Sequence, residues 1–381
     1  MSVTACLITR NHEASLGRAI TSVNGFATEV LVADTGSTDR TVVIAQELGA
    51  KVIAVKWEDD FAAASNAAID AATGEWVLLI NPDEELDVAG VAPLNAAVAL
   101  PGNFAVRVRA QHETSPTEPG QGVLESDVRV FRRDPQARFV GRLHPHFVTP
   151  LASLAASKGK AIVDADAVIR RHLYLSTPTP DKIRWVVRLL ELELRDRPGQ
   201  LPLLIELGRN LLWLNDPRGH EILAEAADVV KAGAGADAPP SPVVGMLFEY
   251  LLNVGPQFSK SRVTSAEIHT MAEKWFPYTP PVVWARAGER FAAADYVAAA
   301  GLLERLVVMG RTGQYDPAGG FSLEIVKEAA LLNLGGAYLH LERWDDARAC
   351  FAPLFGDPNR KADALRGFAL AEKQQKPGTG S

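Results

Sequence analysis

Two acidic side chains directly follow apolar runs in this sequence and are candidates for ligand chemistry. Asp34 comes after Glu29–Ala33, and Asp83 stands in Asn81-Pro82-Asp83, just behind Trp76–Ile80. A carboxylate can accept a hydrogen bond from a ring N–H of a ligand, and with other hard oxygen donors it suits Mg²⁺ or Mn²⁺. The alternatives are a turn or helix-capping role for Asp34 and a solvated Asn-Pro turn for the second segment.

Further polar residues lie in the loops that follow the first two apolar runs. These residues are Thr9, Arg10, Asn11, Glu13, Gly36 and Asp39. Gly36 permits a tight turn behind Asp34. Asp39 falls in the first turn of the helix expected next, where a negative charge is favourable.

The loops belong to a regular alternation of apolar runs and helical patterns. The expected strands are Val3–Ile8, Glu29–Ala33, Lys51–Val55 and Trp76–Ile80, and the expected helices are Ala14–Val23, Thr38–Leu48 and Phe61–Ala72. This alternation predicts βαβ units and an α/β domain with a Rossmann-like, mostly parallel sheet. Because the carboxyl ends of parallel strands share one edge, the polar loops should converge on one crevice there.

Beyond Asp181 the strand signal gives way to helical patterns. The segment LLNLGGAYLHLERWDDARACFAPLF carries Gly335, Tyr338, Trp344, Ala347 and Phe351 at a spacing that resembles a tetratricopeptide (TPR) repeat of ~34 residues. A weaker copy contains Phe291, Tyr296 and Ala299. We predict two domains, 1–175 and 176–381, the second an all-α TPR-like repeat domain, with an ordinary helical bundle as the alternative.

Composition limits the classes of function. The 381 residues are 47% hydrophobic and 22% charged with a net charge of -7, which argues against nucleic acid as a partner. No apolar run is long enough for a membrane span, and the first residues do not resemble a signal peptide. Cys6 and Cys350 form no ligand cluster. The sequence therefore predicts a cytoplasmic protein that is not integral to a membrane.

Four blocks of the first part resemble a family 2 glycosyltransferase, in the order and spacing of that family. They are CLITRNHEASLGRAITSV, EVLVADTGSTDRTVVIAQELGAKV, WEDDFAAASNAAIDAATGEWVLLINPDEEL and VRVFRRDPQARFVGRLHPHF. The resemblance covers roughly residues 1–175 and is closest to the subgroup with a TPR tail. It implies the GT-A fold, a nucleotide-sugar donor, with UDP-sugar expected first, and contacts to that donor from the two polar loops, Asn66 and Asn81.

A metal site is also implied by the resemblance. Related domains use a DxD motif to hold Mn²⁺ or Mg²⁺ against the diphosphate, and the aligned tripeptide here is Asn81-Pro82-Asp83. The first carboxylate is missing, and the last position, Asp83, keeps the metal-binding role that the resemblance assigns to it. His172 resembles a histidine of the family that reaches the metal, although a structural role is the alternative.

The segment that would supply the general base departs from the family's pattern. The family's G-R-I-H-E reads GRLHPH here, so Pro145 replaces the glutamate that would serve as base. His144, His146 and Glu125 are the candidates, since a histidine with a pKa near ~6.5 or a carboxylate can take a proton. Ser65 stands where relatives commonly carry arginine, which removes a cation from the site.

These features lead to two hypotheses. The first is an inverting, metal-assisted glycosyltransferase that acts on a peptide, glycan or lipid-linked acceptor. The second is a degenerate nucleotide-sugar-binding or scaffold protein whose TPR-like domain recognises a partner. The helical domain could hold an acceptor protein, brace the first domain or form a homodimer.

Overall fold

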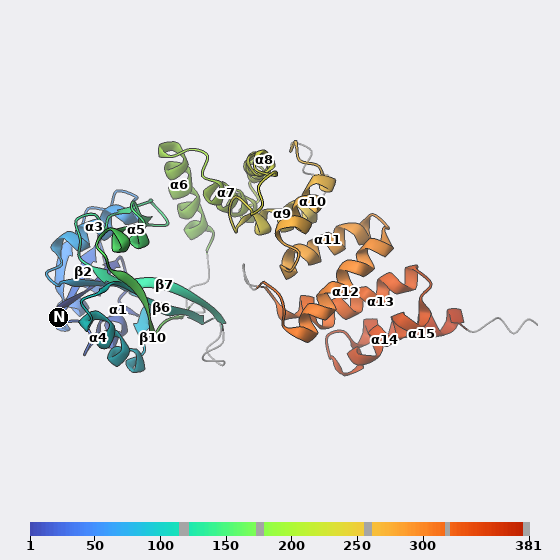
Figure 1. The fold of residues 1–381 in the computed structure, drawn as a ribbon, viewed down its shortest axis with the longest axis horizontal. Coiled ribbons are helices and arrows are strands. Elements are labelled where there is room, and N and C mark those ends of the chain that lie inside the picture. Colours follow the sequence, from blue (N-terminus) through green and yellow to red (C-terminus); the bar gives the residue numbers. More distant parts are fainter. Residues whose placement is uncertain (114–121, 173–178, 255–260, 317–320, 376–381) are drawn as a thin grey trace, which may run out of the picture. The chain divides into compact units, whose positions relative to one another are not determined.

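The computed structural model describes residues 1–113, 122–172, 179–254, 261–316 and 321–375. The chain divides into two compact units, Met1–Pro198 and Gly199–Ser381 (Figure 1). The first unit contains a sheet with helices, and the described part of the second is helical. The predicted succession of an α/β domain and an all-α domain is therefore confirmed.

In the described part of the first unit, eight strands form one sheet in the order β3-β2-β1-β4-β7-β6-β10-β5. Their bounds are β1 Val3–Thr9, β2 Glu29–Asp34, β3 Lys51–Ala54, β4 Trp76–Leu79, β5 Glu84–Leu86, β6 Asn103–Glu113, β7 Gly122–Arg132 and β10 Ala161–His172. Two short strands, β8 (Phe139–Val140) and β9 (His146–Phe147), pair separately. The four strands expected from the sequence agree with β1 to β4 to within one residue.

Strand direction determines which ends share an edge. Strands β1, β2, β3 and β4 are parallel. Because β7 is antiparallel to β4, β6 is antiparallel to β7, and β10 is parallel to β6, both β6 and β10 run with β1. The carboxyl ends of β1, β2, β4 and β10 therefore lie along one edge, which we call the carboxyl edge.

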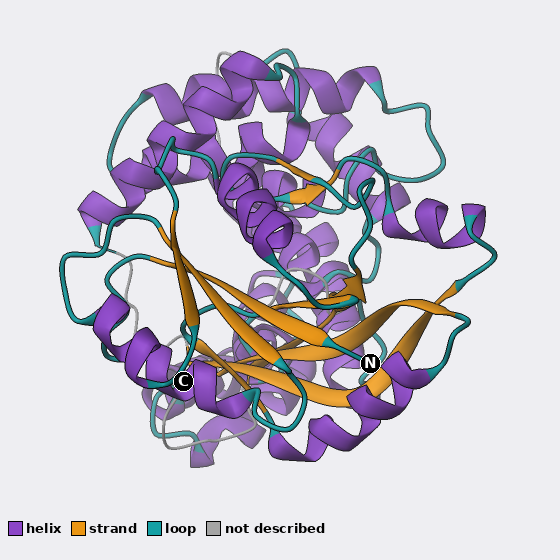
Figure 2. Cartoon of the chain, turned by 90° about the vertical axis from the view of Figure 1, so that its left-hand side faces the viewer, coloured by secondary structure: helices purple, strands orange, loops and turns teal. Residues whose placement is uncertain are grey.

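Helices cover both faces of the sheet, because side chains along each strand alternate between the faces (Figure 2). In β1, Leu7 packs in a core with α1 and α4, whereas Cys6 packs in a second core with α3 and α5. The helices of this unit are α1 Leu16–Ser22, α2 Thr41–Glu47, α3 Phe61–Ala71, α4 Val91–Ala99, α5 Leu151–Ser157 and α6 Pro180–Asp196.

The division between the units comes later than the sequence analysis expected. We predicted it after residue 175, where the strand signal ends, but helix α6 belongs to the first unit. The ring of Trp185 lies 6.3 Å from Trp57 and 5.8 Å from Phe61, centroid to centroid. Arg142 binds Asp196 at 2.7 Å, at the other end of the helix. A contact between such distant segments leaves no periodic signal in the sequence, so the boundary could not be placed from it.

The described helices of the second unit pack in sequence, each against the next over much of the chain. They are α7 Leu201–Trp213, α8 Arg218–Ala232, α9 Val244–Val254, α10 Ser265–Trp275, α11 Pro280–Ala292, α12 Tyr296–Thr312, α13 Glu328–His340, α14 Trp344–Phe351 and α15 Lys361–Gln375. The ring of Phe351 lies where a Cβ on Gly335 or Gly367 would come within 2.5 Å. A small residue at 335 is thus required by packing, as the repeat pattern indicated.

The weaker copy of the repeat corresponds to α11 and α12. Phe291 makes an edge contact with Tyr296 at 5.2 Å, and His340 of α13 stacks on Tyr296 at 4.1 Å. Ala299 is completely buried. The aromatic positions of one helix pair therefore contact the next pair, as expected when neighbouring repeats bury each other's faces.

Candidate functional site

Asp34 ends β2 at the carboxyl edge and organises the loop behind it. Its Oδ2 accepts hydrogen bonds from the backbone N–H groups of Gly36 and Ser37, both at 3.0 Å. Its Oδ1 accepts a 3.4 Å bond from Thr9 Oγ1, at the end of the neighbouring β1. Gly36 has φ 102°, a conformation that favours glycine. The turn role that we weighed for Asp34 is present, and it holds the carboxylate at the end of the strand.

The two polar loops bind each other through the residues predicted to contact a donor. Asn11 Oδ1 accepts from the Thr38 N–H at 2.8 Å. Glu13 Oε2 accepts from the Arg40 N–H at 3.0 Å, and Asp39 Oδ2 accepts from the Glu13 N–H at 3.1 Å. The structure thus brings Asn11, Glu13 and Asp39 together. In this state their polar groups fix the loops, and contact with a donor stays a prediction for them and for the exposed Arg10.

His12 lies in the loop behind β1, and the charge of Asp83 acts on it. Its backbone N–H donates to Thr41 Oγ1 at 2.7 Å, and its Nδ1 accepts from the Arg10 N–H at 3.4 Å. Burial lowers the pKa of His12 below its ordinary value, and Lys182 of α6 lowers it further, while the carboxylate of Asp83 partly offsets both. His12 is therefore neutral at pH 7, and both Asp83 and the amino-terminal end of α6 lie close to it.

Asp83 forms an ion pair with an arginine that the sequence analysis did not select. Arg171, near the end of β10, donates from Nε to Asp83 Oδ2 at 2.9 Å. The two side chains are 35% and 29% exposed, so the pair is open to a ligand. Asn81 is exposed, and its carbonyl accepts from the Glu84 N–H at 3.0 Å. Arg171 meets Asp83 through the pairing of β10 with β5, which the segment RRH does not reveal by itself.

A buried ion pair stands directly behind this turn. Glu84 is 1% exposed and binds both terminal nitrogens of Arg129, at 2.9 and 3.1 Å. Burial lowers the pKa of Arg129, but attraction to Glu84 outweighs it, and the net shift is upward. Glu84 Oε2 also accepts from the Asn81 N–H at 2.8 Å. This carboxylate therefore fixes the position of the turn that carries Asp83.

The metal prediction rests on Asp83 and His172. Among the described residues, no group of three or more His, Cys, Asp or Glu side chains is placed to hold a metal ion. Strand β10 ends at His172, whose side chain lies outside the described part. Asp83 Oδ2 is already bound by a guanidinium, which repels a second cation. The described donors do not fit a metal centre built by the protein, and metal binding by these two residues stays a prediction.

The candidate bases lie in a tight hairpin. Gly141 has φ 112°, and a Cβ there would come within 2.7 Å of the His144 carbonyl. His144 and His146 are exposed, and His146 Nδ1 lies 3.2 Å from the His144 carbonyl oxygen. The Arg142 carbonyl accepts from the N–H of Phe61, which starts α3 behind β3. The hairpin therefore borders the β3 end of the carboxyl edge. The side chain of Glu125 lies outside the described residues.

Asn66 makes contacts of a different kind from those predicted. Its Nδ2 donates to the Phe139 carbonyl at 3.0 Å, and its Oδ1 accepts from the Phe139 N–H at 2.9 Å. This pair of bonds joins α3 to β8. Ser65 is 6% exposed and donates to the Phe61 carbonyl at 2.8 Å. The structure thus gives Asn66 a role in packing, and its contact with a donor is only a prediction.

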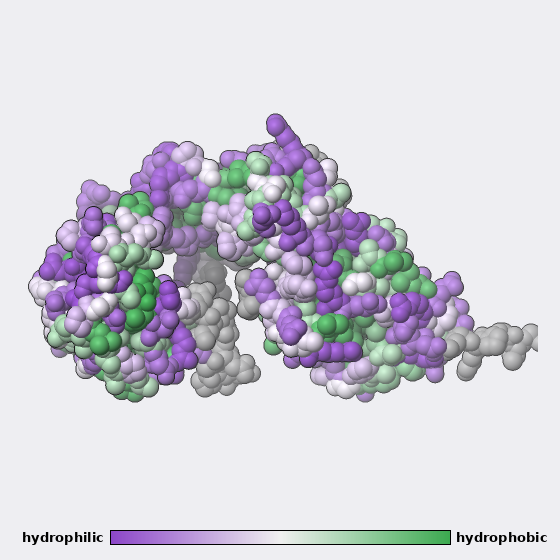
Figure 3. All heavy atoms as spheres, viewed as in Figure 1, coloured by the Kyte–Doolittle hydropathy of each residue, from purple (hydrophilic) through white to green (hydrophobic). Residues whose placement is uncertain are grey.

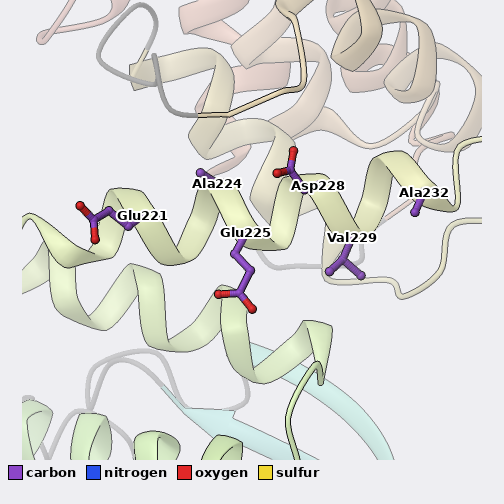
Figure 4. A pocket seen from close by; sticks show the side chains of 6 residues that line it. All are labelled: Glu221, Ala224, Glu225, Asp228, Val229 and Ala232. Carbon is purple, nitrogen blue, oxygen red and sulfur yellow. The ribbon is translucent and has the colours of Figure 1, made fainter.

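The helical unit has a hollow on α8 of about 630 Å³ (Figure 4). All of its lining residues, Glu221, Ala224, Glu225, Asp228, Val229 and Ala232, come from this one helix. A surface supplied by a single helix face lacks the converging polar groups of a catalytic pocket. We take the carboxyl edge of the sheet as the candidate site, because the ends of parallel strands bring polar side chains together there.

Figure 3 shows hydrophilic residues over the surface of each unit, and smaller hydrophobic areas are scattered among these residues. Among the described residues, none of the helices combines the length and the apolar character that crossing a bilayer requires.

Comparison with known proteins agrees with this geometry. Residues 4–169 match the model of the family described as Glycosyl transferase family 2. A TPR repeat-containing protein of Synechococcus elongatus is 34% identical over 221 residues, which cover 56% of this chain and 53% of that protein. An uncharacterized glycosyltransferase of Rickettsia bellii is 43% identical over 84 residues, covering 22% and 28%.

The chain thus spans about half, or less, of the length of these curated relatives. Among solved structures, it is similar to S. aureus TarS, with 15% identity and a TM-score of 0.39, over 72% of this chain and 55% of that one. Residues 4–169 of this chain are therefore similar to glycosyltransferase family 2, and the α/β sheet lies within the matched segment.

Proposed function

We propose that the protein is an inverting glycosyltransferase that transfers a sugar from a UDP-sugar to a hydroxyl or other nucleophile of a peptide, glycan or lipid-linked acceptor. The observation that carries the proposal is the gathering of Thr9, Asp34 and Asp83 at the carboxyl edge of a family 2 domain. Ligands of open α/β sheets bind at that edge. The reducing interior of a cell is the proposed setting, because both cysteines are buried free thiols.

In the proposed reaction an acceptor oxygen attacks the anomeric carbon of the donor sugar. The bond between that carbon and the diphosphate oxygen breaks, and UDP leaves with both electrons of the bond. The acceptor's proton passes to a base, for which His144 and His146 are the described candidates and Glu125 the third. Direct displacement inverts the configuration at the anomeric carbon. No step of this reaction is assigned to a metal ion, because the described donor groups do not form a metal site.

Asp34 has a separate role in this proposal. It presents a carboxylate whose position is fixed by two backbone N–H groups and by Thr9. Such a fixed acceptor suits the ring N–H of uracil. Thymine carries the same ring N–H, whereas guanine presents its ring N–H on a larger base, so this contact favours UDP-sugars over GDP-sugars. The preference for UDP- over dTDP-sugars follows from the family resemblance alone.

A thermal-shift panel of UDP-, GDP- and dTDP-sugars, each with and without Mn²⁺, tests the donor. A ligand that binds only the folded state raises the melting temperature. The expected result is a shift with UDP-sugars that Asp34→Ala abolishes, with Asp70→Ala as a control on the exposed side of α3. If no nucleotide-sugar shifts the native protein, the proposal is wrong.

A second function is favoured by specific contacts of the same residues. The amide of Asn66 is engaged by Phe139, Asp83 by Arg171, and Pro145 stands between the two histidines. These contacts suit a degenerate domain that binds a nucleotide-sugar without turnover, with the helical unit recognising a partner. Donor hydrolysis separates the two: slow release of UDP that His144→Ala or His146→Ala reduces supports the enzyme, whereas binding without release supports the scaffold.

A further inference from the structure

We propose that Arg171 binds the diphosphate of the donor and that Asp83 is the residue that positions its guanidinium. This inference rests on the proposed function, and it assigns to an arginine of the chain the neutralising role expected of a metal ion. It begins from the ion pair between Arg171 and Asp83 at the carboxyl edge.

Strand geometry places Arg171 where a diphosphate would lie. It is the penultimate residue of β10, and its register partner on β5 is Glu84, the residue after Asp83. The carboxyl end of β10 lies at the same edge as the loop of Asp34. Asp83 lies close to His12, which belongs to the polar loop behind β1. Arg171 therefore lies at the same edge of the sheet as the polar loops.

The hydrogen bonds of Arg171 leave its recognition groups available. Nε donates to Asp83 Oδ2 at 2.9 Å, and neither Nη1 nor Nη2 has a hydrogen-bond partner among the residues that the structure describes. Two parallel N–H donors of a guanidinium match two oxygens of a phosphate, which is the geometry of bidentate binding. The bond to Asp83 holds the side chain in one orientation, so little conformational freedom is lost when the ligand arrives.

Two neighbouring arginines, Arg129 and Arg170, do not share the combination of contacts that Arg171 has. Arg129 uses both terminal nitrogens for Glu84, and its side chain is 14% exposed. Arg170 precedes Arg171 in the strand, so it lies on the opposite face of the sheet, where Nη2 binds Asp87 at 2.6 Å. Of these three arginines, Arg171 alone combines a fixed Nε with a terminal fork open to solvent.

The charge of Arg171 also suits the reaction. As the bond from the anomeric carbon to the diphosphate breaks, negative charge grows on the departing oxygen. A cation already in place stabilises that charge without having to move during the reaction.

Calorimetric titration of the 381-residue chain with UDP tests the inference, once in EDTA and once in Mn²⁺. The native protein should bind UDP in EDTA. Arg171→Gln should weaken that binding by about tenfold or more, as expected when a charge-assisted bond is lost. Arg171→Lys should lie between, because it keeps the charge without the fork. Arg170→Gln is the matched control and should bind like the native protein, and circular dichroism verifies that each variant is folded.

Asp83→Asn separates the two roles of this carboxylate. Asparagine keeps an oxygen that accepts from Nε but lacks the charge that repels a diphosphate. The variant should bind UDP in EDTA at least as tightly as the native protein, whereas a metal ligand would lose affinity in Mn²⁺. The inference is overturned if UDP binds only with Mn²⁺ and Arg171→Gln leaves that binding unchanged. If UDP binds under neither condition, the proposed function fails, and this inference with it.

Discussion

Replacing Glu84 with glutamine should destabilise the sheet unit and displace the turn that carries Asp83. Glu84 is 1% exposed, receives two hydrogen bonds from Arg129 and one from the Asn81 N–H. Glutamine has nearly the same shape but no charge. The substitution therefore leaves the guanidinium of Arg129 buried beside a neutral amide and removes one of its acceptors.

The magnitude follows from burial. Removing one partner of a buried ion pair costs about 3–5 kcal/mol. Arg129 keeps a 2.7 Å bond from Nε to Asp127, and the glutamine oxygen still accepts one bond, so we expect a cost at or below the lower limit of that range, about 2–3 kcal/mol. For a unit of this size each kcal/mol lowers the melting temperature by about 2–4 °C, which gives a decrease of roughly 4–12 °C.

Differential scanning calorimetry of the full chain measures this change, and Glu85→Gln is its control. Glu85 is the next residue and pairs with Arg18, but the two side chains are 33% and 49% exposed. Exposed pairs contribute about 0–1 kcal/mol. If Glu84→Gln and Glu85→Gln melt within about 2 °C of each other, burial does not set the strength of the Arg129 pair, and the reasoning is refuted.

The remaining predictions concern packing and pH. Gly335→Ala should destabilise the helical unit by about 1–3 kcal/mol in urea denaturation, because the new Cβ would lie 2.5 Å from the Phe351 ring. Gly336→Ala should stabilise it by about 0.5–1 kcal/mol, because the nearest atom to its Cβ, Phe291 Cζ at 3.7 Å, is at ordinary van der Waals distance. Asn66→Ala should lower the melting temperature in differential scanning calorimetry, because it removes both hydrogen bonds to the Phe139 backbone. His269 is buried, which lowers its pKa, so the folded unit binds fewer protons than the unfolded chain just below pH 6.5. The urea concentration at the unfolding midpoint should therefore fall as the pH drops below about 6.5. In His269→Gln this midpoint should depend less on pH over the same range.

The sheet and its loops could be predicted from the sequence because local patterns determine them. Strand β1 is a short apolar run buried on both faces, so Leu7 and Cys6 enter different cores, and such a run between helical patterns is visible in the sequence itself. The TPR-like signature also has a local cause, since the Phe351 ring occupies the space that a side chain at Gly335 would need. Helix α6 was assigned to the wrong side of the boundary, because its place depends on Trp185 meeting Trp57 across a long sequence separation.

The candidate site was predicted only in part. Residue types at strand ends indicated Asp34, Asp39 and Asp83 as members of one edge, because parallel strands bring their carboxyl ends together, and their part in a binding site stays a prediction. The partners of those carboxylates could not be read, since Arg171 meets Asp83 through the pairing of β10 with β5. Strand order in space, rather than spacing along the chain, determines such pairs.

The missing carboxylate at Asn81 and the presence of Arg171 are best understood together. A dicarboxylate at this turn would attract a divalent cation, whereas one carboxylate beside one guanidinium is already neutral as a pair. The approach of a diphosphate to that neutral pair is opposed less than its approach to two acids. Asn81 thus removes a charge that Arg171 would otherwise have to balance, and the fork of the arginine is left to bind the phosphates. The loss of a metal ligand and the gain of a phosphate-binding group are, on this view, two consequences of the same electrostatic arrangement.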